Sequence, residues 1–143
     1  MNDEQTTPKP DLSLVIPVYN GSRTIPQLVE RITTVFASMS VEIVLVNDGS
    51  EDDSEIVCEA LVQKWPAVIT LVNLSRNFGE HNAVLAGLNY SRGQYVAVLD
   101  DDGQNPPEEV MSMLQELTQA LRRYLRPLHR EAAFVVSQRR KLV

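Results

Sequence analysis

The chain of 143 residues is predicted to fold as an α/β domain with a mostly parallel sheet flanked by helices. Short apolar runs alternate with segments that have helical periodicity, and turn-forming residues separate the two. The length and the 43% hydrophobic content suit one domain with a single sizeable core. Because strands that alternate with helices are joined by crossover connections, the pattern favours parallel strands.

The first three predicted elements have clear signals. Residues 12–18 (L-S-L-V-I-P-V) form an apolar run typical of a buried strand. Residues 25–39 carry apolar side chains at helical spacing, and Pro26 suits the first turn of that helix. Residues 41–46 (V-E-I-V-L-V) are the second apolar run, and we expect a second buried strand there.

The middle of the chain continues the alternation. A turn of sequence D-G-S precedes a helix expected over residues 54–64, with Asp52 or Asp53 as its N-cap. A third strand is expected over residues 68–73, and a short helix over 82–90.

The last predicted elements are a strand, a longer helix and a final strand. Residues 95–99 form the fourth apolar run. Proline and glutamate residues then open a helix that we expect to run from about residue 106 to 124, before Pro127. Residues 132–137 are predicted to be a fifth strand, and residues 1–10 a disordered lead.

Charge and cysteine content narrow the class of protein. The net charge is −6, but residues 1–121 carry 18 acids and 6 bases (−12), whereas residues 122–143 carry 1 acid and 7 bases (+6). An acidic body argues against nucleic acid as a partner. The basic end has two interpretations, contact with anionic lipid or a solvated helix face and terminus.

The single cysteine, Cys58, excludes a disulfide framework and is expected to be a buried apolar residue. No apolar run reaches the roughly 18 residues that a membrane-spanning helix needs. We therefore expect a cytoplasmic location, including a peripheral position at the inner face of the membrane.

Polar clusters follow each of the first four predicted strands. They are Tyr19 and Asn20, then residues 47–50, then residues 75–77, then Asp100 to Asp102. In parallel α/β sheets, ligands bind outside the carboxyl ends of the strands. The sequence therefore predicts one binding site built from these four loops.

Three consecutive aspartates after the fourth strand are the strongest single signal. Like charges this close repel one another unless a cation neutralises them, and oxygen ligands suit Mg²⁺ or Mn²⁺. In an extended chain Asp100 and Asp102 face the same way, so they could share one ion while Asp101 points elsewhere. The neutral amide of Gln104 could complete the metal shell. A solvated acidic turn is the alternative.

Four other residues are candidates for ligand binding, and three of them have an alternative interpretation. Asp48 could accept hydrogen bonds from a base or ribose, or form an Asx turn, or both. Tyr19 could stack on a planar ligand or be an ordinary turn residue. Arg76 could hold a phosphate, or pair with Glu80 or with the acidic cluster. Gly79 could let the backbone turn close to a ligand.

Four motifs, in this order, resemble the inverting family-2 glycosyltransferases of the GT-A fold, in the branch that acts on polyprenyl phosphates. The motifs are S-L-V-I-P-V-Y-N, E-I-V-L-V-N-D-G-S-E-D-D-S, L-S-R-N-F-G-E-H-N-A-V-L-A-G-L and L-D-D-D-G-Q-N-P-P-E-E. The resemblance covers about residues 12–117. It departs from the family at Gly21, where an acid is common, and at Gly103, where an apolar residue is commoner.

The resemblance implies roles for the candidate residues. A base pocket would include Pro17 and Tyr19, with Asp48 on the base, and the R-N-F-G loop would lie near the diphosphate. The implied nucleotide-binding set is Pro17, Val18, Tyr19, Asn20, Asp48, Ser50, Arg76, Asn77, Gly79, Asp100 and Asp101. The implied Mg²⁺ or Mn²⁺ ligands are Asp100, Asp102 and Gln104.

The expected function is metal-dependent binding of a nucleotide-sugar, with a UDP-sugar favoured over a GDP-sugar. In the full-length family the acceptor is a polyprenyl phosphate, and transfer inverts the anomeric carbon. Residues 11–143 would be the donor-binding part, and the catalytic base is expected in a half that this chain lacks, through truncation, a split reading frame or a degraded gene. The exposed sheet edge that results could favour self-association.

The same residues allow two other functional interpretations. The chain could be a non-catalytic fragment that binds a nucleotide or a partner without turnover. A signalling receiver domain also binds Mg²⁺ through clustered acids, but it needs an acidic pair after the first strand and a phosphoacceptor after the third. This chain has Tyr19 and Asn20, and then Ser75 and Arg76, at those places, which disfavours the receiver domain.

Overall fold

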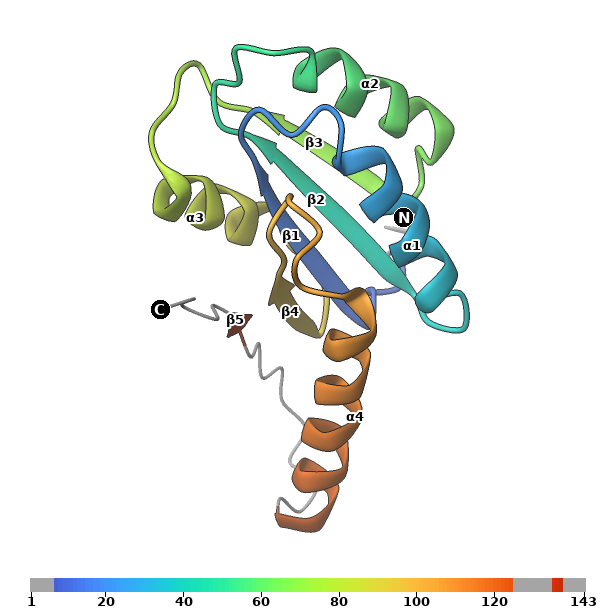
Figure 1. The fold of residues 1–143 in the computed structure, drawn as a ribbon. Coiled ribbons are helices and arrows are strands. Elements are labelled where there is room, and N and C mark those ends of the chain that lie inside the picture. The colour runs from blue at the N-terminus through green and yellow to red at the C-terminus, as the bar shows by residue number, and fades with distance from the viewer. Residues whose placement is uncertain (1–6, 125–134, 138–143) are drawn as a thin grey trace, which may run out of the picture.

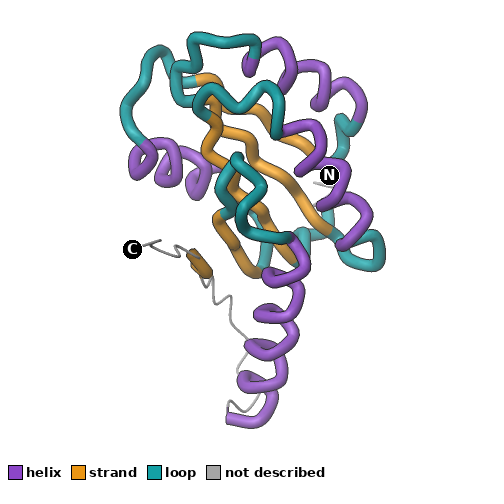
Figure 2. Tube along the Cα trace, viewed as in Figure 1, coloured by secondary structure: helices purple, strands orange, loops and turns teal. Residues whose placement is uncertain are grey.

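A computed structural model describes residues 7–124 and 135–137 of the chain. Helices and strands alternate as predicted, and the helices lie on both faces of a central sheet (Figures 1 and 2). The elements are β1 (Leu12–Val18), α1 (Ile25–Val35), β2 (Val41–Asn47), α2 (Ser54–Lys64), β3 (Ile69–Asn73), α3 (Glu80–Tyr90), β4 (Tyr95–Val98), α4 (Pro107–Tyr124) and β5 (Val135–Ser137).

The sheet has the strand order β3-β2-β1-β4-β5. Every strand pair that the structure describes is parallel, so the predicted α/β class is confirmed. In the central register Val15 of β1 lies opposite Val44 of β2 and Val98 of β4. The strand order reverses direction at β1, which places the loops after β1 and β4 side by side. Self-association through an exposed sheet edge stays a prediction.

The observed bounds differ from the predicted ones at a few ends. Helix α1 stops at Val35 rather than residue 39, and the hydroxyls of Thr33 and Thr34 donate to the carbonyl of Glu30 in its last turns. Helix α3 starts two residues early because Gly79, at φ 92°, allows the chain to turn directly into it. Of the fifth predicted strand, residues 132–134 lie outside the described part.

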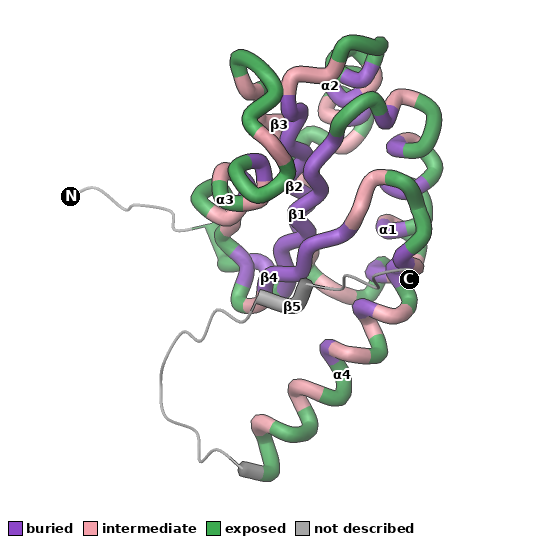
Figure 3. Tube along the Cα trace, turned by 60° about the vertical axis from the view of Figure 1, so that its left-hand side comes forward, coloured by how far each residue is buried: buried purple, intermediate pink, exposed green. Residues whose placement is uncertain are grey.

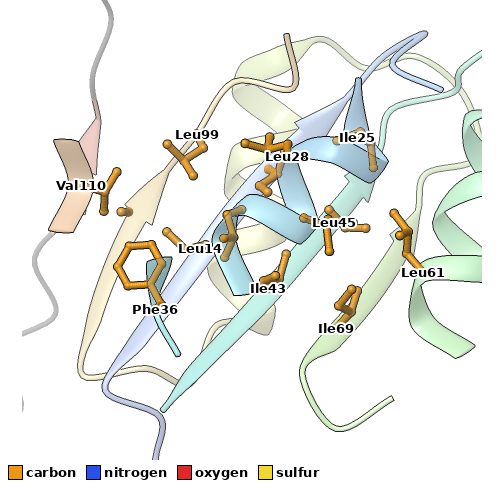
Figure 4. Close-up of a cluster of buried hydrophobic side chains, with 14 of the residues drawn as sticks. Leu14, Ile25, Leu28, Phe36, Ile43, Leu45, Leu61, Ile69, Leu99 and Val110 are labelled. Atoms are coloured by element: carbon orange, nitrogen blue, oxygen red, sulfur yellow. The ribbon is translucent and has the colours of Figure 1, made fainter. Parts of the chain in front are cut away.

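Two apolar cores lie on opposite faces of the sheet. Because strand side chains alternate, Leu14 and Ile16 of β1 face the core formed with α1, α2 and α4, whereas Val15 faces the core formed with α3. Figure 4 shows the larger core, and the buried strands stand out along the sheet in Figure 3. Cys58 is fully buried in the larger core, as expected, and burial raises the pKa of its thiol to about 12.

Helix α4 packs on the sheet through its first turns and then extends beyond it (Figure 1). Val110 and Leu114 are buried in the larger core. A two-bond ion pair joins Arg31 of α1 to Glu108, with Nε–Oε1 at 2.9 Å and Nη2–Oε2 at 2.8 Å. In the part of the chain that the structure describes, no helix has the length and apolarity needed to cross a membrane.

A buried polar cluster lies near the amino ends of the strands. The Glu42 side chain of β2 accepts a hydrogen bond from Ser13 Oγ at 2.5 Å and another from the backbone N–H of Arg92. The Arg92 guanidinium pairs with the same carboxylate at 3.2 Å. The N–H of Gly93 donates to Ser13 Oγ at 2.7 Å, so β1, β2 and the segment before β4 are joined at this end.

Candidate functional site

A cavity of about 360 Å³ opens at the carboxyl ends of the strands, where the sequence predicted a site. The loops after β1, β2, β3 and β4 all contribute to it. Its lining residues are Pro17, Val18, Tyr19, Asp48, Asn77, Gly79, Glu80, Asp100, Asp101 and Asp102. Among these described lining residues five are acidic and none is Lys or Arg, so the cavity suits a ligand that carries a cation.

Four predicted site residues do not line this cavity. They are Asn20, Ser50, Arg76 and Gln104. Conversely, Glu80 lines the cavity although the sequence did not single it out as a binding residue. Its position at the first residue of α3, after a glycine that turns the chain, is the signal that could have found it.

Asn20 and Ser50 join two of the loops. The N–H of Asn20 donates to Ser50 Oγ at 3.1 Å, and Asn20 Oδ1 accepts from the N–H of Glu51 at 2.9 Å. Asn20 has a positive φ of 52°, which this residue type tolerates better than most. These two residues therefore shape the site by holding the loop after β1 against the loop after β2.

Asp52 reinforces the same junction. Its Oδ1 accepts from the N–H of Ser54 at 2.9 Å and from Ser54 Oγ at 2.5 Å, and its Oδ2 accepts from the N–H of Ser22 at 3.2 Å. Desolvation raises the pKa of Asp52, but the hydrogen bonds from Ser54 and Ser22 outweigh it and lower the pKa to about 2. Asp53, the other predicted cap, makes no side-chain cap bond.

Asp48 joins the loop after β2 to the loop after β3. Its side chain is 3% exposed, and Oδ1 accepts from the backbone N–H of Phe78 at 2.7 Å. The adjacent Gly49 has a φ of 65°, and a Cβ on it would lie 2.3 Å from the backbone nitrogen of Asn77. The two loops thus touch backbone to backbone, and Asp48 is held at the cavity wall by a bond to a different loop.

The three consecutive aspartates are held by three different donors. Asp100 Oδ2 accepts from Asn105 Nδ2 at 3.0 Å, and Asp102 Oδ1 accepts from the N–H of Gln104 at 2.9 Å. Asp101 Oδ2 accepts instead from the N–H of Tyr19, across to the loop after β1, at 3.0 Å. Burial raises the pKa of the Asp101 carboxyl, and the neighbouring aspartates add to that rise.

Gln104 is exposed and lies outside the cavity, so it is less well placed than the aspartates to contact a bound ion. Asn105 is 9% exposed and holds Asp100, a supporting role that the sequence did not indicate. Its buried position just before α4 could not be read from local pattern.

Arg76 lies next to the cavity rather than in its lining. Its guanidinium carbon stands 4.7 Å from the centre of the Phe78 ring, within the range of a cation–π contact. Both side chains are exposed on the loop before α3. The predicted contact of Arg76 with a phosphate stays a prediction.

The donors present fit a divalent metal that is held mainly by phosphate and water. Among residues 7–124 and 135–137, no group of three or more His, Cys, Asp or Glu side chains is arranged to hold a metal ion. Mg²⁺ commonly takes only one or two protein carboxylates and completes its shell with water and substrate phosphate. Asp100 and Asp102 both line the cavity, so a site of this open kind is chemically consistent with the residues present.

Most of the chain is similar in sequence to known glycosyltransferases. Residues 13–126 match the family model of glycosyl transferase family 2. The undecaprenyl-phosphate 4-deoxy-4-formamido-L-arabinose transferase of Pseudomonas paraeruginosa (strain DSM 24068 / PA7) is 42% identical over 110 residues, which are 76% of this chain and 32% of that protein. The protein of the same name from Shewanella sediminis (strain HAW-EB3) is 40% identical over 105 residues, 72% of this chain and 32% of that protein.

Solved structures share the fold. The mannosyltransferase PcManGT from Pyrobaculum calidifontis, in complex with GDP-Man and Mn²⁺, has a TM-score of 0.60 and 23% identity, and the match covers 67% of this chain and 28% of that one. S. aureus TarS 1-349 in complex with UDP-GlcNAc has a TM-score of 0.60 and 21% identity, covering 76% and 31%. The chain spans about a third of the length of the curated relatives it matches.

Proposed function

This chain belongs to glycosyl transferase family 2, and on that premise we propose that it binds a nucleotide-sugar together with Mg²⁺ or Mn²⁺. It would be the donor-binding part of an enzyme that transfers a sugar to a polyprenyl phosphate. The observation that carries the proposal is the acidic cavity at the carboxyl ends of the parallel strands, lined by Tyr19, Asp48 and three aspartates.

The cavity residues suit the parts of such a ligand. Tyr19 is 47% exposed at the cavity, so its ring can stack on a nucleobase. The buried Asp48 carboxylate can accept hydrogen bonds from a base N–H or a ribose hydroxyl. Asp100 and Asp102 would hold the metal, which neutralises charge on the diphosphate when it is bound.

The relatives and the solved neighbours support a proposal for the acceptor and for the class of donor. The relatives that match at 40% and 42% identity are named for transfer to undecaprenyl phosphate, and the solved neighbours bind GDP-Man or UDP-GlcNAc. We favour a UDP-sugar over a GDP-sugar as donor, and a polyprenyl phosphate as the acceptor, with inversion at the anomeric carbon. We also propose a cytoplasmic location, and a peripheral position at the inner face of the membrane would place the site beside a lipid phosphate.

Calorimetry of UDP binding in the presence of MnCl₂ tests this proposal. Asp100→Ala and Asp102→Ala are each expected to abolish the Mn²⁺-dependent part of the affinity, because each removes a metal ligand. Asp53→Ala is the matched control, since this exposed aspartate makes no side-chain cap bond and does not line the cavity. Unchanged UDP affinity in both cavity variants would contradict the proposal.

A second experiment separates an enzyme from a non-catalytic binding fragment. The protein is incubated with a labelled UDP-sugar, Mn²⁺ and a polyprenyl phosphate, and the lipid fraction is assayed for label. Because the match covers only 32% of each of these relatives, we expect binding with little or no transfer by this chain alone. Efficient transfer would show instead that residues within this chain supply the catalytic base.

A further inference from the structure

We propose that Asp101 is a positioning residue of this site, which holds the backbone of Tyr19 in place by occupying the space that Gly21 leaves open. It would act through Tyr19 and bind neither the metal nor the nucleotide directly. The inference rests on the proposed function and assigns one of the three consecutive aspartates a role different from that of the other two.

Two hydrogen bonds join the loop after β4 to the loop after β1. Asp101 Oδ2 accepts from the N–H of Tyr19 at 3.0 Å. The backbone carbonyl of Asp101 accepts from Thr24 Oγ1 at 2.6 Å. The two contacts bracket the segment from Tyr19 to Thr24, which leads from the cavity wall into α1. Asp101 therefore fixes this segment through its side chain and its backbone together.

Gly21 supplies the room for the carboxylate. A Cβ built on Gly21 would lie 2.7 Å from Asp101 Oδ2 and 3.3 Å from Asp101 Cγ. Gly21 is buried and has no positive φ, so the absence of a side chain there serves close approach rather than an unusual backbone. Any side chain at position 21 would have to displace the Asp101 carboxylate.

The three consecutive acids have different partners. Asp101 and Asp102 lie in a turn after β4, and the Asp101 carboxylate accepts its hydrogen bond from the loop after β1. Asp100 and Asp102 are instead each held by a group from residues 104–105. Asp101 therefore affects binding by fixing the position of the Tyr19 ring over the ligand.

Three single variants test the inference by calorimetry with UDP and MnCl₂. Asp101→Ala removes the acceptor, and we expect affinity to fall about fivefold, the usual worth of one such hydrogen bond. Gly21→Ala introduces a methyl group that displaces the Asp101 carboxylate. Because this carboxylate is the end of a flexible side chain, it can move away at little cost in stability, and we expect a similar loss of UDP affinity. Asp101→Asn keeps an acceptor oxygen and is expected to bind within about twofold of the unaltered protein.

The double variant makes the test specific to this contact. In the Asp101→Ala background, Gly21→Ala is expected to cost nothing further, because the clash and the hydrogen bond are already gone. Additive losses would overturn the inference. So would loss of Mn²⁺-dependent binding in Asp101→Asn as complete as in Asp100→Asn, because Asp101 would then be a metal ligand. Unchanged affinity in Asp101→Ala would also overturn it.

An NMR measurement on the nucleotide-free protein keeps this test independent of the proposed function. The amide resonance of Tyr19 is expected to move on Asp101→Ala and on Gly21→Ala, and to move much less on Asp101→Asn. If the unaltered protein binds no nucleotide, the proposed function fails, while these shifts still decide whether Asp101 holds Tyr19. A Tyr19 resonance that stays unmoved in Asp101→Ala would overturn the inference.

Discussion

Near the amino ends of the strands the buried carboxylate of Glu42 is paired with the guanidinium of Arg92, whereas at the carboxyl ends Asp48 and Asp101 accept backbone N–H groups of neighbouring loops. The first arrangement contains its own counter-charge. In the second, the hydrogen bonds fix the loops, and the described residues that line the cavity include no Lys or Arg. The lining of this cavity therefore has an excess of acidic side chains.

This difference suggests that the cluster around Glu42 affects mainly the stability of the fold, whereas the cavity acids affect mainly ligand binding. Removing one partner of a buried, hydrogen-bonded charge is costly, because the groups left behind lose their compensation. Acids gathered in one cavity repel one another and cost some stability, which a bound metal and nucleotide can restore by binding only the folded chain. Mutations near the amino ends of the strands are therefore expected to lower the free energy of unfolding. Mutations at the carboxyl ends of the strands are expected to lower the affinity for the ligand.

The largest effect is expected from Glu42→Ala. The change leaves Ser13 Oγ and the N–H of Arg92 without their acceptor in a buried cluster, so the free energy of unfolding should fall by about 2–4 kcal/mol. Urea unfolding measures it, with Glu116→Ala on the exposed side of α4 as control. A loss of UDP affinity without a loss of stability would break the comparison, because the cluster would then act on the cavity.

Two glycine substitutions are expected to have intermediate effects with different causes. A Cβ on Gly93 would lie 2.5 Å from both the backbone nitrogen and Oγ of Ser13, so Gly93→Ala should cost about 2–3 kcal/mol through overpacking. Gly103 has open space around it but a φ of 73°, so Gly103→Ala should cost only about 1 kcal/mol.

Urea unfolding of the two glycine variants checks these costs, and UDP calorimetry checks which of them alters the cavity. The comparison predicts reduced affinity for Gly103→Ala, which lies between two of the acids and their donors, and unchanged affinity for Gly93→Ala. The opposite result would mean that the two ends are energetically coupled.

The smallest effect is expected from acid titration of Asp52. Its pKa is lowered to about 2 in the folded protein, below its ordinary value, so its contribution to stability is present above about pH 4 and is lost as pH falls toward 2. Asp52→Asn should therefore lose less stability than the unaltered protein between pH 4 and pH 2. Thermal unfolding across that interval gives the measurement, and parallel curves for the two proteins would refute the lowered pKa.

Local sequence pattern predicted most of the fold because buried parallel strands are apolar along their whole length. Strand β1 and helix α2 have the predicted bounds. Other elements, such as α1 and α3, begin or end a few residues from the predicted position, because local turn geometry sets their ends. The site could also be located, since the carboxyl ends of parallel strands lie at one edge. The lining could be predicted only in part, since Arg76 was expected in it and lies outside, whereas Glu80 lines the cavity and was not expected there.

The sequence by itself determined the alternation of elements, the acidic character of the site and its place at the strand ends, because each follows from residue type and period along the chain. Only the tertiary structure decided the partner of each acid. Asp101 meets Tyr19 across 82 positions, and Asp48 meets Phe78 across 30. Such contacts depend on how four separate loops pack against one another, and no local pattern carries that information.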